Sequence, residues 1–133
     1  MSYSGFERGR PLSHVNIADL ESVLGRKLPD DYRSFLLEYG DAFVGGLVDG
    51  AADLPVLSFF GVDGGTDLFA KLRMYPDFHN DGVLPIARCE LGNIYVLDKE
   101  NKVHYVNYYG GQTRVRDVAN TFQEFVDRIV VDD

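Results

Sequence analysis

The sequence predicts an α+β fold in a single domain, with a mixed and mostly antiparallel β-sheet packed against about four helices. Helical periodicity occurs near both ends of the chain, and short apolar segments separated by turn residues occupy the middle. The 133 residues are 45% hydrophobic, which suits one domain with a real core. We expect residues 1–14, which include Gly5, Gly9 and Pro11, to form a loosely ordered lead-in to a domain over residues 15–133.

The first two helices are predicted from their ends. Asn16 is a suitable N-cap for a first helix, and Gly25 would end it. Pro29 suits the first turn of a second helix, which would end near Gly40. Apolar residues recur at helical spacing in both segments, so one face of each helix should be buried. These residues are Ile17, Leu20 and Leu24 in the first helix, and Tyr32, Phe35, Leu36 and Tyr39 in the second.

The middle of the chain is predicted to contain strands and one short helix. Between residues 41 and 65, glycine-rich turns alternate with β-branched and aromatic patches, which indicates one or two strands. Thr66 could cap a helix over residues 67–74. Residues 83–88, 93–98 and 102–108 are typical of three consecutive strands, and Asn101 can adopt the left-handed conformation of the turn between the last two. The stretch Ile94–Leu97 is apolar on both faces, so its strand should lie inside the sheet.

The last helix is predicted from a capping box. Thr121 and Glu124 have the spacing at which each side chain can satisfy a backbone N–H of the other residue. Apolar residues then follow on one helical face: Phe122, Phe125, Val126 and Ile129.

The charge balance argues against two classes of partner. The chain has 13 Lys and Arg against 21 Asp and Glu, which gives a formal net charge of −8. Nucleic acids and anionic membrane surfaces are bound through clustered basic residues, so we expect neither as a ligand. A basic protein is compatible with this charge, because an acidic surface attracts it at long range.

The compartment is expected to be the cytoplasm. Cys89 is the single cysteine, so no internal disulfide can form, and the first residues lack the pattern of a signal peptide. No run of apolar residues approaches the length of a membrane-spanning helix.

The sequence shows no pattern typical of catalysis or metal binding. His14, His79 and His104 are too widely spaced to form a metal motif, and Cys89 is distant in sequence from each of them. The segment Asp63–Asp67 contains glycines but no lysine, so it does not match a phosphate-binding loop. We therefore expect no catalytic residues, no metal and no cofactor, although distant residues could still converge in the fold.

Two groups of residues are candidates for contacting a protein partner. Aspartates recur through the glycine-rich middle segment, and tyrosines crowd the end of the last predicted hairpin. The aspartates could instead be ordinary solvated residues, and the tyrosines could pack in the core. The predicted partner-binding residues are Asp49, Asp53, Asp63, Asp67, Tyr105 and Tyr108.

An ordered set of short motifs extends from about Val15 to Ile129: Leu20-Glu21, Leu24-Gly25, Leu28–Arg33, Phe35-Leu36, Leu84–Ala87, Gly92-Asn93, Ile94–Leu97, Val118-Ala119, Thr121-Phe122 and Glu124-Phe125. Taken together, these motifs resemble those of the SMI/KNR family of the SUKH superfamily. Two departures affect partner surfaces: the sequence has Tyr39-Gly40-Asp41 where many members have an Asn-Gly pair, and it contains no tryptophan.

The resemblance implies a mixed sheet with helices and no catalytic machinery. In bacteria it implies an immunity protein that neutralises a toxin, often a nuclease, and the acidic charge suits such a basic partner. A general regulatory or scaffold module without a toxin is the alternative, since fungal members are linked to cell-wall regulation through protein contacts. An enzyme is the third hypothesis, and the sequence gives it the least support.

Overall fold

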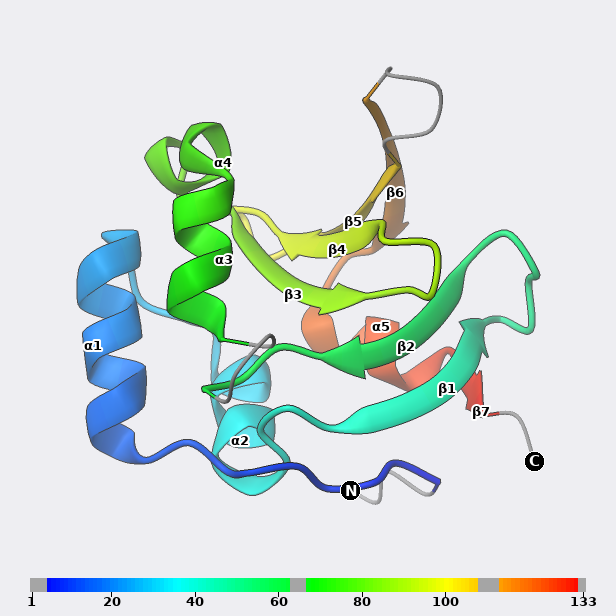
Figure 1. Cartoon of the computed structure of the whole chain (residues 1–133), viewed down its shortest axis with the longest axis horizontal. Coiled ribbons are helices and arrows are strands. Elements are labelled where there is room, and N and C mark those ends of the chain that lie inside the picture. The colour runs from blue at the N-terminus through cyan, green and yellow to red at the C-terminus, as the bar shows by residue number, and fades with distance from the viewer. Residues whose placement is uncertain (1–4, 63–66, 108–112, 132–133) are drawn as a thin grey trace.

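A seven-stranded sheet lies at the centre of the computed structural model, which describes residues 5–62, 67–107 and 113–131 (Figure 1). The strand order is β6-β5-β4-β3-β2-β1-β7, and each neighbouring pair is antiparallel. This arrangement confirms the predicted α+β class. The strands are β1 (Phe43–Val48), β2 (Pro55–Phe59), β3 (Leu84–Arg88), β4 (Ile94–Leu97), β5 (Val103–Asn107), β6 (Arg114–Ala119) and β7 (Ile129–Val131).

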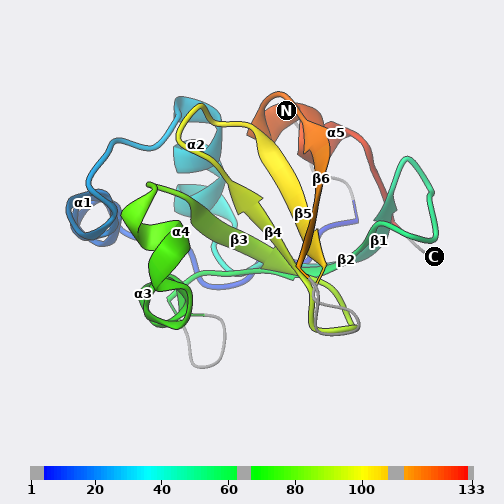
Figure 2. The same cartoon turned by 90° about the horizontal axis from the view of Figure 1, so that it is seen from above.

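Five helices accompany the sheet in the described residues. Figure 2 shows α2 and α5 on one face of the sheet, while α1, α3 and α4 lie together beside it. The helices are α1 (His14–Leu24), α2 (Asp30–Glu38), α3 (Leu68–Met74), α4 (Pro76–Asn80) and α5 (Phe122–Asp127).

The core between the sheet and the helices α2 and α5 is rich in aromatic rings. The ring of Phe35 on α2 lies 4.7 Å from that of Phe59 on β2 and 5.1 Å from that of Phe122 on α5, measured between centroids. Tyr95 on β4 lies 4.9 Å from Phe125. Phe35 and its neighbour Leu36 are almost completely buried, as the helical spacing predicted.

The helix starts follow capping chemistry, but two caps differ from those predicted. Ser13, and not Asn16, caps α1: the Ser13 hydroxyl accepts a hydrogen bond from the Asn16 N–H at 3.0 Å, and the Asn16 side chain accepts one from the Ser13 N–H. Asp67 caps α3 by accepting from the Phe69 N–H at 2.9 Å. The predicted cap Thr66 lies outside the described residues. In both cases the predicted and the observed cap lie within three residues of each other, and both residue types are good caps.

The three central strands are confirmed, and so is the conformation of Asn101 in the turn between β4 and β5, where its φ is 67°. All four residues of β4 are buried inside the sheet. The strands β6 and β7 and the helix α4 were not predicted. Ile129 was placed on the last helix, but it begins β7 because α5 ends at Asp127.

Residues 5–12 lie against the domain. Leu12 is buried, and the Gly9 N–H donates a hydrogen bond to the carbonyl of Tyr39 at 2.9 Å. Gly40 has φ of 60°, and a Cβ at this position would come within 1.8 Å of the Arg10 carbonyl oxygen. Glycine is therefore required where the lead-in crosses the end of α2.

Candidate functional site

A hollow of about 380 Å³ lies where the loop between β1 and β2 meets the β5–β6 hairpin. It brings together Asp53 and Tyr105, two of the residues predicted to bind a partner. The other lining residues come from the hairpin: Asn107, Arg114, Val115 and Arg116.

Asp53 forms an ion pair across this hollow. The Arg116 Nη1 donates to the Asp53 Oδ2 at 2.6 Å, and this hydrogen bond lowers the pKa of Asp53. Both side chains remain more than half exposed, so the pair contributes little to stability. The pair connects the β1–β2 loop to the edge strand β6.

Tyr105 forms the floor of the hollow. The side chain is only 4% exposed, its hydroxyl accepts a hydrogen bond from the Asn93 amide at 3.2 Å, and its ring lies 4.7 Å from that of Tyr95. Burial raises the pKa of Tyr105 to about 12. The Cys89 sulfur lies 3.3 Å from the same hydroxyl and is also buried, so it packs as a core residue. Tyr108 lies outside the described residues.

Asp49 shares the β1–β2 loop with Asp53, and it is also paired. The Arg128 Nε donates to both Asp49 carboxylate oxygens, at 3.1 and 3.0 Å, and hydrogen bonding to Arg128 lowers the pKa of Asp49. Asp67 lies apart from these two, because it caps α3 after the other end of β2. Asp63 lies outside the described residues. The hollow therefore brings together Asp53 and Tyr105, Asp49 lies in the same loop as Asp53, and Asp67 has a local structural role.

A second hollow, of about 160 Å³, lies beside His104 on β5. The His104 Nε2 lies 2.6 Å from the Asp98 Oδ2, and its Nδ1 lies 2.8 Å from the Asp117 Oδ1. Burial raises the pKa of Asp98, but hydrogen bonds from His104 and from the backbone N–H groups of Lys102 and Glu100 outweigh it, so the pKa is lowered overall. This contact between three side chains was not predicted, because residues 98, 104 and 117 meet only through strand pairing.

The lowered pKa of Asp98 predicts a dependence of stability on pH. The ionised carboxylate stabilises the fold above its unfolded-state pKa, near 3.9, and this contribution is lost as the pH falls through the lower folded-state value. Asp98→Asn should therefore destabilise the protein at pH 6, and the difference from wild type should shrink at pH 2 to 3. Urea unfolding at several pH values measures this. An equal difference at every pH would contradict the assignment.

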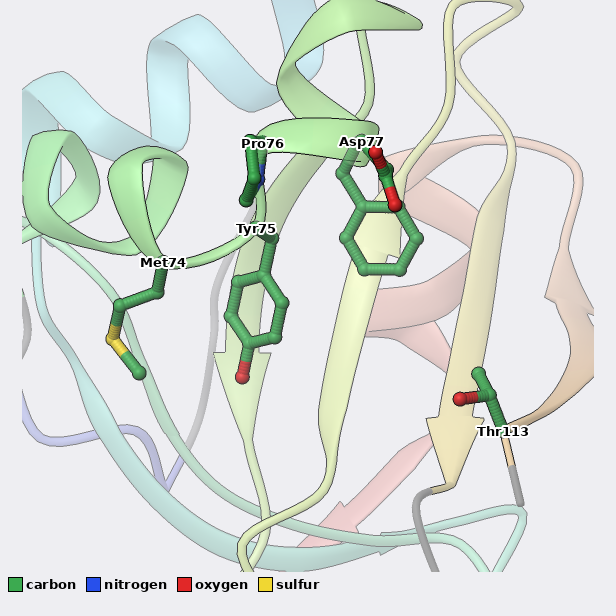
Figure 3. Close-up of a pocket in the computed structure, with 6 residues that line it drawn as sticks. Met74, Tyr75, Pro76, Asp77 and Thr113 are labelled. Carbon is green, nitrogen blue, oxygen red and sulfur yellow. The ribbon is translucent and has the colours of Figure 1, made fainter. Parts of the chain in front are cut away.

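A third hollow, of about 270 Å³, lies between the α3–α4 corner and the start of β6. Figure 3 shows Met74 and Tyr75 on one side of it and Thr113 on the other. The lining contains one charged side chain, Asp77, so it offers no convergent set of acid, base and nucleophile.

The described residues also contain no group of three or more His, Cys, Asp or Glu side chains that could hold a metal ion. His79 lies on α4, and its Nε2 contacts the Val23 carbonyl oxygen of α1 at 2.6 Å. Within residues 5–62, 67–107 and 113–131, no helix has the length and apolar character needed to cross a membrane.

The geometry of the three hollows does not identify a protein family, but comparison with known families does. The profile of the SMI1/KNR4 family (SUKH-1) matches residues 11–128, most of the chain. The chain belongs to the SMI1/KNR4 family. No curated protein sequence matches it.

Residues in the SMI1/KNR4-like motifs of this chain pack in the core or cap helices. Leu28 and Tyr32 are buried where α1 turns into α2, and Thr121 caps α5 by accepting a hydrogen bond from the Glu124 N–H at 3.0 Å. Glu124 completes the cap by accepting from the Asn120 N–H, one residue before the predicted donor. Most residues around the 380 Å³ hollow lie on the surface instead, although Tyr105 at its floor is buried.

Proposed function

We propose that this chain is a non-catalytic protein-binding module that acts as an immunity protein, neutralising a cognate toxin in the cytoplasm. The observation that carries the proposal is membership of the SMI1/KNR4 family over residues 11–128.

The partner is proposed to be a basic protein, such as a nuclease toxin. A net charge of −8 favours encounter with a basic surface at low salt, and a nuclease must itself present positive charge to its substrate. Neither nucleic acid nor a membrane is proposed as a ligand.

The β1–β2 loop is the proposed contact. The Asp49 and Asp53 carboxylates are 52% and 67% exposed although each has an arginine partner, so basic side chains of a partner can reach their remaining oxygen lone pairs. The buried ring of Tyr105 supports the hollow beneath this loop. Asp63 stays in the proposal as the next acid along the chain, whereas Asp67 is assigned mainly to its helix cap.

A growth assay tests the proposal. Cells express the product of the gene next to this one, either alone or together with this chain. If that product is a toxin, co-expression of this chain should restore growth. The double variant Asp49→Asn with Asp53→Asn should bind the toxin more slowly at low salt, since charge steering acts mainly on the association rate.

The matched control removes two charges elsewhere. Asp19 on α1 and Glu90 after β3 are exposed, and the variant Asp19→Asn with Glu90→Gln changes the net charge by the same amount. Equal association rates for the two double variants would remove the β1–β2 loop from the proposal. Failure of the chain to restore growth would favour the regulatory alternative over immunity.

A further inference from the structure

The outer edge of β6 is an exposed strand edge at the end of the sheet (Figure 1). Its first four residues, Arg114–Asp117, are exposed, and β5 is its one strand partner in the described part of the chain. Such an edge can pair with an extended segment of another protein through main-chain hydrogen bonds. We infer that β6 accepts an extended segment of a different protein that carries acidic residues at alternate positions.

The two arginines of β6 determine the charge of that segment. Arg114 pairs with Asn107 of β5 and Arg116 pairs with Tyr105, so both arginines lie on the face that carries the 380 Å³ hollow. Arg116 already forms an ion pair with Asp53, whereas Arg114 has no polar partner within residues 5–62, 67–107 and 113–131. An acidic side chain on an added strand would supply one.

A second copy of this chain does not fit the edge. Antiparallel pairing of β6 with itself about a two-fold axis places residues of the same face opposite each other. In a register centred on Arg114 or on Arg116, that arginine lies opposite the same arginine of the other copy. In a register centred on Val115, Arg114 lies opposite Arg116. In a register centred on Asp117, the two copies of this aspartate lie opposite each other. Every register centred on an exposed residue therefore places like charges opposite each other, which destabilises the pairing.

The same sequence favours an acidic–apolar–acidic segment from another protein. Acidic residues would lie opposite Arg114 and Arg116, and an apolar residue between them would lie opposite Val115, which is 60% exposed. A basic residue would lie opposite Asp117. This inference goes beyond the proposed function, because it concerns main-chain pairing at the outer edge of β6 and a segment of opposite charge to the toxin surface.

A short blocked peptide of sequence Thr-Lys-Glu-Val-Glu-Thr, which runs antiparallel to β6, is the probe. In NMR titrations at 0.15 M salt, it should shift the backbone amide signals of residues 114–117. The charge-reversed peptide Thr-Glu-Lys-Val-Lys-Thr should bind at least about fivefold more weakly, as one to two favourable cross-strand pairs predict.

Two substitutions with the same change in net charge locate the site. Arg114→Glu should weaken binding of the acidic peptide about fivefold or more and should improve binding of the charge-reversed one. Arg73→Glu, on the exposed side of α3, should change neither by more than about twofold, because screening limits the effect of distant charges. Equal binding of the two peptides, equal effects of the two substitutions, or dimerisation of the wild-type chain through β6 in sedimentation and NMR experiments would overturn the inference.

Discussion

Replacing Phe35 with alanine is expected to lower the free energy of unfolding by about 3–5 kcal/mol. The side chain is 1% exposed and joins α2 to the sheet and to α5, with ring centroids of Phe59 and Phe122 at 4.7 and 5.1 Å. Removing the ring leaves a cavity between rigid elements that cannot collapse to fill it. Such a loss is a large share of the stability of a domain of this size.

Urea denaturation of Phe35→Ala, followed by circular dichroism, measures this loss. Phe43→Ala is the matched control, because Phe43 on β1 is 47% exposed and the same atoms are removed from a site that water already reaches. The midpoint should fall much further for Phe35→Ala than for Phe43→Ala. An unchanged midpoint with an unchanged m-value for Phe35→Ala would contradict the described core.

Arg26→Ala is expected to cost about 2–4 kcal/mol, from the loss of several hydrogen bonds made by one charged group. The guanidinium donates to the carbonyls of Gly82 and Asp98, both at 2.7 Å, and to the side-chain oxygen of Asn101 at 2.9 Å. It thereby joins the end of α1 to the turn before β3 and to the β4–β5 turn. Without it, partly buried acceptors in both turns lose their donor.

Arg26→Lys provides the control for charge. Lysine keeps the positive charge but lacks the planar fork that reaches three acceptors at once, so most of the loss should remain. Amide hydrogen exchange of residues 98–102 should also become faster in both variants. Wild-type stability and exchange in Arg26→Lys would show that charge alone, and not the fork geometry, holds the turns.

Local signals in the sequence were sufficient for much of the fold. Gly25 ends α1 with φ of 86°, and Asn101 takes the left-handed conformation of its turn, because these requirements depend on a few neighbouring residues. The burial of Phe35 followed from helical spacing in the same way. In contrast, the sequence did not predict β6, because four of its six residues are exposed and three of those are charged, so it lacks the apolar pattern of a strand.

The candidate site was only partly predictable, for a physical reason. Asp49 and Asp53 were singled out as acids in glycine-rich loops, but their arginine partners lie 79 and 63 residues further along the chain. Such pairs depend on the register of the sheet and on where α5 ends, and neither is encoded locally. The burial of Tyr105 was not predictable from the sequence for a similar reason. Side chains alternate between the two faces of a strand, but this alternation does not indicate which face is buried.

The proposed function requires that this chain acts by binding its protein partner, without catalysing a reaction on it. The most direct measurement is a titration of the purified product of the neighbouring gene with increasing amounts of this chain, in which the activity of that product is followed. A binding module should reduce the activity linearly to a plateau at a fixed stoichiometric ratio that does not change with incubation time. Complete inactivation by a small fraction of an equivalent, increasing with time, would show catalytic turnover and contradict a role in binding alone.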